Sequence, residues 1–218
     1  MSSTSAIFGM LGSNTISEIV LPIVKRQFAN DNLFFVDDDP EKLNVNYLGV
    51  PIKTNTDGWD SIIKSGGNFR MAICLGEKHL FRRKVLFHKF NLYQNLSFPS
   101  LIHSSSVLAE TCVITDGCIL SFGVIVGHGT LIKYNSIVWS GVVIEHDCII
   151  GESCYIAPSA TLSGFVTVGD CTLIGSGAVI LPEVNIGSGC LIGAGSVVTR
   201  DIPDNSVAYG TPAKVVRS

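Results

Sequence analysis

The sequence predicts a small α/β domain with a parallel sheet over residues 1–98, followed by a parallel β-solenoid over residues 99–218. Three observations support this prediction. Strand-like and helix-like segments alternate in the first half, and aliphatic residues recur every six positions in the second half. Between the two halves, the segment from Phe98 to Ile102 contains a proline and interrupts the first pattern before the second begins.

The first half is expected to contain short buried strands that alternate with amphipathic helices. The strands are expected at residues 5–9, 33–36 and 69–75, and the helices at residues 16–28 and 77–90. Ser13, Asn14 and Thr15 are candidate N-caps of the first helix. Because ligands of open parallel sheets bind at the carboxyl ends of the strands, a site is expected near residues 9–14, 37–38 and 76.

The loop before the first helix reads Gly9-Met-Leu-Gly-Ser-Asn14, which is not the glycine pattern of a dinucleotide-binding fold. A dinucleotide cofactor is therefore not expected. A loop at a helix N-terminus can still bind a diphosphate through its backbone N–H groups. A strand–helix turn without a ligand explains the loop equally well, and the same two alternatives apply to the acidic run from Asp37 to Asp39.

The second half follows a six-residue period without a slip. Every sixth residue from Ile102 to Val198 is Ile, Leu or Val, and the residue four positions later is always small or Val. Five of the seven cysteines occupy that small-residue position: Cys112, Cys118, Cys148, Cys154 and Cys190. A free cysteine packs as a small hydrophobe, so these thiols are expected in a tight interior. Short strands joined by tight corners, as in a β-solenoid, account for this period.

Composition excludes several classes of function. The net charge is −3 and the basic residues are scattered, which argues against a nucleic-acid partner. No apolar run reaches the roughly 18 residues of a membrane span, and the first residues lack a signal pattern, so a cytoplasmic location is expected. The odd number of cysteines and the absence of a C-x-x-C pair favour reduced thiols and no metal site.

Four sequence elements together resemble one family. They are Phe-Val-Asp-Asp-Asp-Pro at residues 35–40, Ile-Cys-Leu-Gly at 73–76, Ile-Glu-His-Asp-Cys at 144–148 and Tyr-Gly-Thr-Pro-Ala-Lys at 209–214. In this order they resemble the sugar O-/N-acyltransferases that include bacillosamine-pathway and perosamine N-acetyltransferases and sialic acid O-acetyltransferases. The resemblance implies a left-handed β-helix with three hexads, or 18 residues, per coil. His128, His146 and Gly164 would then form one column, in which Gly164 leaves an open groove for a ligand beside His146.

The resemblance also implies the roles of individual residues. His146 corresponds to the general base and Asp147 to the acid that assists it. The nucleotide sugar would be bound by residues of the first domain, with His128 and Trp139 as further candidate substrate contacts: Leu11, Gly12, Ser13, Asp37, Asp38 and Gly76. Acetyl-CoA would lie along the solenoid, between subunits of a homotrimer, against Tyr155, Gly164, Ser176 and Ala194.

The function implied is acetyl transfer from acetyl-CoA to the amino group of a nucleotide-linked amino-deoxy sugar, such as a 4-amino-4,6-dideoxyhexose, for lipopolysaccharide, O-antigen or a related surface glycan. No metal and no covalent intermediate are needed. An O-acetyltransferase acting on sialic acid or another sugar, and a non-catalytic solenoid scaffold, are the alternatives.

The chain departs from the family pattern at three places. The glycine-rich loop is replaced by residues 9–14, Tyr155 stands where histidine is frequent, and Trp139 stands where asparagine is frequent. The aromatic side chain of Trp139 predicts a reshaped sugar pocket.

Overall fold

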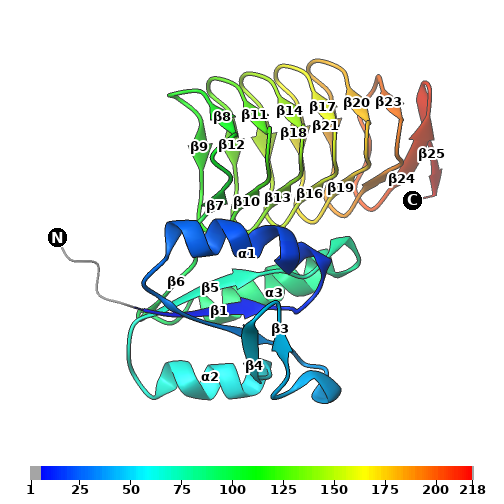
Figure 1. Ribbon diagram of the computed structural model, residues 1–218. Coiled ribbons are helices and arrows are strands. Elements are labelled where there is room, and N and C mark those ends of the chain that lie inside the picture. Colours follow the sequence, from blue (N-terminus) through cyan, green and yellow to red (C-terminus); the bar gives the residue numbers. More distant parts are fainter. Residues whose placement is uncertain (1–5, 218) are drawn as a thin grey trace. The chain divides into compact units, whose positions relative to one another are not determined.

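The computed structural model describes residues 6–217, which divide into two compact units, Met1–Leu101 and Ile102–Ser218 (Figure 1). The division therefore lies within the segment from Phe98 to Ile102. Residues 1–5 and 218 lie outside the described range. Ser5, which begins the first expected strand, and the first residues of the segment without a signal pattern are among them.

The first unit is built on a six-stranded sheet with the order β3-β4-β2-β1-β5-β6. Its strands are β1 (Ile7–Leu11), β2 (Asn32–Val36), β3 (Asn46–Tyr47), β4 (Val50–Thr54), β5 (Phe69–Ile73) and β6 (Leu96–Ser97). All neighbours are parallel except β3 and β4, which form an antiparallel hairpin at one edge. The carboxyl ends of β1, β2 and β5 consequently meet at the same edge of the sheet.

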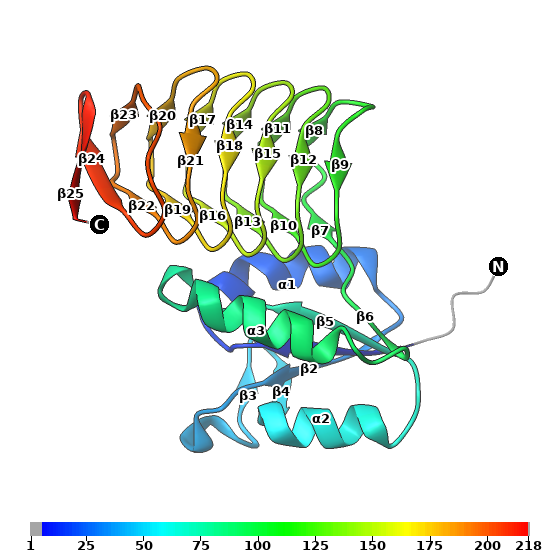
Figure 2. The ribbon, with the colours of Figure 1, turned by 180° about the vertical axis from the view of Figure 1, so that it is seen from behind.

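Three α-helices and two short 3₁₀ turns connect these strands. They are α1 (Thr15–Gln27), α2 (Thr56–Lys64), α3 (Leu80–Phe90), and the turns at Pro40–Lys42 and Glu77–His79. Helices α1 and α3 cover one face of the sheet and α2 covers the other (Figures 1 and 2). Asn14 is the N-cap of α1: its side chain accepts from Ile16 N at 2.9 Å, while Ser17 Oγ accepts from Asn14 N at 3.0 Å.

An aromatic cluster forms the centre of the first unit. Trp59 of α2 is fully buried and packs edge-on against Phe34 and Phe69, with ring centroids 5.1 and 5.4 Å apart. A Cβ at Gly9 would lie 2.9 Å from Trp59 Cζ2. The glycine that begins the first loop is thus required by packing of the core.

The sequence located α1, α3 and three strands, with boundaries two or three residues away from those observed, but it missed β3, β4 and α2. These elements have weak signals: β3 has two residues, and α2 is identified mainly by its N-cap, Asn55, whose side chain accepts from Gly58 N at 2.9 Å. The helix expected from residue 77 begins as a 3₁₀ turn, and α3 starts at Leu80.

The second unit is a three-sided parallel β-helix. Its first face contains β7 (Leu101–Ile102), β10 (Ile119–Leu120), β13 (Ile137–Val138), β16 (Tyr155–Ile156), β19 (Leu173–Ile174), β22 (Leu191–Ile192), β24 (Val207–Gly210) and β25 (Ala213–Arg217). Its second face contains β8 (Val107–Leu108), β11 (Ile125–Val126), β14 (Val143–Ile144), β17 (Thr161–Leu162), β20 (Val179–Ile180) and β23 (Val197–Val198). Its third face contains β9 (Val113–Ile114), β12 (Leu131–Ile132), β15 (Ile149–Ile150), β18 (Thr167–Val168) and β21 (Asn185–Ile186).

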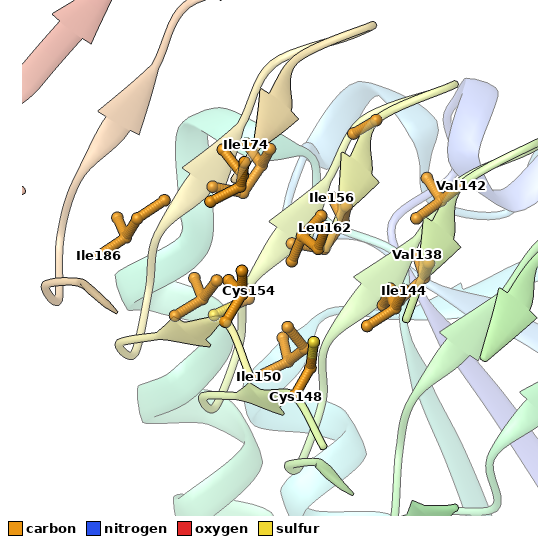
Figure 3. Close-up of a cluster of buried hydrophobic side chains, with 14 of the residues drawn as sticks. Val138, Val142, Ile144, Cys148, Ile150, Cys154, Ile156, Leu162, Ile174 and Ile186 are labelled. Atoms are coloured by element: carbon orange, nitrogen blue, oxygen red, sulfur yellow. The ribbon is translucent and has the colours of Figure 1, made fainter. Parts of the chain in front are cut away.

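Strand pairing confirms a coil of 18 residues. Val126 pairs with Ile144, and Ile144 pairs with Leu162, each in the next coil of the second face. The aliphatic residues of the six-residue period point inward and form one continuous buried core (Figure 3). We name the turns between the first and second faces the first corner, those between the second and third faces the second corner, and those between the third and first faces the third corner.

The small residues of the period form a second interior feature, a ladder of hydrogen bonds between coils. Thr130 Oγ1 donates to the carbonyl of Glu145 at 2.6 Å and accepts from Cys148 N at 3.0 Å. Cys148 Sγ in turn donates to the carbonyl of Ser163 at 3.1 Å. The interior cysteines therefore both fill space and satisfy carbonyl groups that face the core.

Candidate functional site

The second corner contains the Glu-His-Asp triplet, directly after β14. Asp147 N donates to the carbonyl of His128 at 2.8 Å, and Phe165 N donates to the carbonyl of His146 at 3.0 Å. These bonds join corresponding positions of successive coils. The predicted column of His128, His146 and Gly164 is thereby confirmed.

His146 and Asp147 form a hydrogen-bonded pair. The distance from His146 Nδ1 to Asp147 Oδ2 is 3.0 Å, and both side chains are 50% exposed. An ionised carboxylate can only accept a hydrogen bond, so the shared proton belongs to Nδ1 and the lone pair lies on Nε2. The pair therefore presents a proton acceptor at an exposed corner.

Two glycines make room for this pair. A Cβ at Gly129 would lie 2.4 Å from Asp147 Oδ1, and a Cβ at Gly164 would lie 2.6 Å from His146 Cε1 and 2.7 Å from Nε2. The sequence had suggested that Gly164 leaves an open groove for a ligand. In the structure the imidazole of His146 fills that space, so this interpretation of Gly164 is wrong.

His128 lies one coil before His146, where its Nδ1 is 3.2 Å from Thr111 Oγ1. The same hydroxyl accepts from Gly129 N at 3.0 Å. Thr111 thus orients His128, although sequence analysis did not identify it. Thr111, Gly129 and Phe165 are found by stepping 18 residues in either direction from Asp147, so the coil length could have revealed all three.

The other candidates in the β-helix lie on a different part of the coil. Trp139, Ser176 and Ala194 follow strands of the first face and lie at the first corner, and Tyr155 belongs to β16 of the first face. Trp139 is 5% exposed, and its ring lies 5.8 Å from that of Tyr155. The structure therefore divides the predicted site residues of the solenoid between two corners of one chain.

The carboxyl edge of the sheet in the first unit forms a pocket. Four of the predicted nucleotide-sugar residues line it, together with three others: Leu11, Gly12, Asp37 and Asp38, with Val36, Leu75 and Arg82. Arg82 of α3 forms an ion pair with Asp38 at 2.5 Å. Gly76 follows Leu75 and caps the 3₁₀ turn at Glu77–His79.

Ser13 acts on this pocket through Asp37. Its N–H and its Oγ both donate to Asp37 Oδ2, at 2.9 and 2.5 Å. Burial acts to raise the pKa of Asp37, but the bonds from Ser13, the N–H of Asp39 and the charge of Lys42 outweigh it, so this pKa lies below its ordinary value. Asp37 is therefore an ionised structural acceptor.

The loop from Gly12 to Asn14 uses its N–H groups within the protein. Gly12 N donates to the carbonyl of Val36 at 2.8 Å, Ser13 N to Asp37, and Asn14 N to Ser17 Oγ. These donors are engaged, which favours the strand–helix turn over a diphosphate loop. The neighbouring Arg83 is fully buried and donates to the carbonyls of Ile73 and Leu75, so it holds the end of β5.

The thiols are poor nucleophiles. Burial raises the pKa of the Cys148 thiol and raises that of Cys154 to about 12. Over residues 6–217, no three His, Cys, Asp or Glu side chains are grouped so that they could hold a metal ion. In the same range, no helix has both the length and the apolar character needed to cross a membrane.

Comparison with known proteins places these features in context. Residues 129–164 and 165–200 match the family described as bacterial transferase hexapeptide (six repeats). No curated protein matches the sequence.

Solved structures resemble the whole chain. The acetyltransferase domain of PglB from Neisseria gonorrhoeae, in complex with acetyl coenzyme A, has a TM-score of 0.86 at 25% identity, covering 98% of this chain and 100% of that chain. PerB from Caulobacter crescentus, in complex with CoA and GDP-perosamine, has a TM-score of 0.85 at 28% identity, covering 98% of both chains. WeeI from Acinetobacter baumannii shares the fold, with a TM-score of 0.77 at 22% identity and coverage of 97% and 100%.

These similarities confirm the predicted fold class, an α/β domain followed by a left-handed β-helix of hexapeptide repeats. Repeat, fold and coverage of both units together identify the chain as an acyltransferase of the hexapeptide-repeat class, similar over its whole described length to sugar acetyltransferases.

Proposed function

We propose that this enzyme transfers the acetyl group of acetyl-CoA to the amino group of a nucleotide-linked amino-deoxy sugar, with His146 as the general base. One observation carries the proposal: the bond from His146 Nδ1 to Asp147 leaves Nε2 as a proton acceptor at a half-exposed corner. PerB, which is similar over both units, was solved with CoA and GDP-perosamine.

The chemistry requires little beyond this base. His146 Nε2 takes a proton from the sugar ammonium group, and the free amine attacks the thioester carbonyl. The C–N bond forms, the C–S bond breaks, and the departing CoA thiolate can receive the proton from the imidazolium. No covalent enzyme intermediate is required, which agrees with the buried positions of Cys148 and Cys154.

The binding roles follow the two units. The pocket at the edge of the sheet is proposed to bind the nucleotide, and Arg82 supplies a positive charge at its rim, 2.5 Å from Asp38. Tyr155, Ser176 and Ala194 are proposed to contact acetyl-CoA along the first face and first corner. Because both substrates are cytoplasmic metabolites, the proposal places the enzyme in the cytoplasm, in lipopolysaccharide, O-antigen or related surface-glycan synthesis.

The distribution of the residues supports a site made by two copies of the chain. His146 lies at the second corner, whereas Ser176 and Ala194 lie at the first. One full face of the coil separates these corners, so they do not border one groove. A ring of copies in which the second corner of one meets the first corner of the next brings them together, and a homotrimer is the arrangement proposed.

The reaction is tested by incubating the protein with acetyl-CoA and a panel of acceptors while CoA release is followed. The panel contains UDP-, dTDP- and GDP-linked 4-amino sugars, matched 4-hydroxy sugars and free sialic acid. We expect turnover only with amino sugars. Turnover only with sialic acid or a hydroxy sugar would assign O-acetylation, and no turnover with any acceptor would favour a scaffold.

The shared site is tested by mixing two inactive variants, His146→Ala and Ser176→Trp, which disable different corners. In randomly mixed trimers, about a quarter of the contacts between copies pair an intact base with an intact CoA corner. We therefore expect recovery of about a quarter of wild-type turnover in hetero-oligomers purified through two affinity tags.

The matched control for this mixing replaces Ser176→Trp by the double variant His146→Ala/Ser176→Trp, which cannot restore any contact. It should stay inactive. Absence of recovered turnover with the first mixture, in oligomers shown to contain both variants, would place the base and the CoA contacts within one copy.

A further inference from the structure

Phe165 occupies a backbone position that does not suit it. Its φ is +62°, in the left-handed region, which disfavours large side chains. Glycine takes the corresponding place in other coils, as at Gly129 and Gly177. The side chain is also 53% exposed, so core packing does not explain the aromatic ring. Neither backbone preference nor burial accounts for phenylalanine at this corner.

The ring of Phe165 does make one specific contact. It meets the imidazole of His146 edge to face, with ring centroids 5.1 Å apart and an interplanar angle of 89°. The backbones of the two residues are joined by the bond from Phe165 N to the carbonyl of His146, at 3.0 Å. Contact and register together fix Phe165 beside the imidazole.

The imidazole is thereby bounded on three sides. Asp147 holds Nδ1, the backbone at Gly164 lies against the edge formed by Cε1 and Nε2, and Phe165 covers a further side. A half-exposed histidine held only at Nδ1 would retain other side-chain rotamers. The aromatic ring removes space that those rotamers need.

We propose that Phe165 is a positioning residue, which holds His146 in the orientation required for proton transfer. Unfavourable backbone conformations at functional sites persist where the geometry they impose is needed. The proposal rests on the proposed role of His146 as the base. It assigns to Phe165 no contact with either substrate.

Three variants test it with the amino-sugar assay and thermal unfolding. Phe165→Gly removes the ring and suits the left-handed backbone, so Tm should stay equal or rise while kcat falls about ten- to a hundred-fold. KM for both substrates should change less than about two-fold, because no substrate contact is lost. Phe165→Tyr keeps the ring and should retain kcat within about three-fold.

Glu183→Gly is the matched control. Glu183 lies one coil further along the same corner, with an exposed side chain and a φ of +64°. Its replacement should leave kcat unchanged. Wild-type kcat in Phe165→Gly, a kcat loss accompanied by an equal loss of Tm, a rise in KM alone, or equal damage by Phe165→Tyr would each overturn the proposal.

A spectroscopic measurement makes the test independent of turnover. In protein labelled with ¹³C-histidine, the His146 ring signal, assigned by its absence in His146→Ala, should move in Phe165→Gly because the ring current of Phe165 is lost. It should stay in place in Glu183→Gly. An unmoved signal in Phe165→Gly would overturn the contact, whereas inactivity of the wild-type protein toward all acceptors would overturn only the proposed function.

Discussion

Replacing His146 by alanine should lower kcat/KM for the amino sugar by about 10²- to 10⁴-fold, the usual contribution of a positioned general base. The loss should fall on kcat, because Nε2 acts on the proton that moves in the transition state. Steady-state kinetics with acetyl-CoA and the best nucleotide-linked amino sugar measure it directly. Folding should be little affected, because the side chain is 50% exposed and makes its one polar contact with the adjacent Asp147.

His103 provides a matched control for this variant. It is another corner histidine of the same solenoid, with Nδ1 2.8 Å from Ser105 Oγ and its ring 5.7 Å from that of Phe122. Its environment resembles that of His146 in geometry, but a hydroxyl replaces the carboxylate. His103→Ala should retain wild-type kcat. Near-normal turnover in His146→Ala, or an equal loss in His103→Ala, would contradict the assignment of His146 as the base.

The arrangement of the solenoid could be predicted because its period is rigid. A strand of two residues leaves no freedom of register, so residues 18 apart must stack, and the column of His128, His146 and Gly164 follows from counting. Counting does not give side-chain rotamers. That the imidazole turns over Gly164, rather than leaving the space to a ligand, depends on the bond from Nδ1 to Asp147.

The first unit shows a different limit of sequence reasoning. The residues at the carboxyl edge of the sheet were found, because the ends of parallel strands converge whatever their side chains do. Their hydrogen bonds were not found: the N–H of Ser13 meets Asp37 and not a ligand. Arg82 was missed as a pocket residue because its role depends on how α3 crosses the sheet, which no local pattern encodes.

Gly164→Ala is expected to disable the enzyme without removing any functional group. The added methyl group would lie 2.6 Å from His146 Cε1 and 2.7 Å from Nε2, which are closer than carbon atoms approach, so the imidazole must move. Gly164 has no positive φ, and alanine fits its backbone. Displacement of a reacting group by about 1 Å can cost 10²-fold in rate, and we expect a loss of that size in kcat, measured in the same assay.

The cause of that loss can be separated from two others. Gly123→Ala adds a methyl group at another corner glycine, where the nearest atom would be 3.8 Å away, so it strains the backbone at φ +70° without displacing a side chain. It should lower the free energy of unfolding by about 1 kcal/mol and leave kcat unchanged. If Gly164 instead served acetyl-CoA directly, as the resemblance implies, Gly164→Ala would raise KM for acetyl-CoA at constant kcat. That result would contradict the displacement of His146, because a moved base changes the rate of proton transfer and not the affinity for the acyl donor.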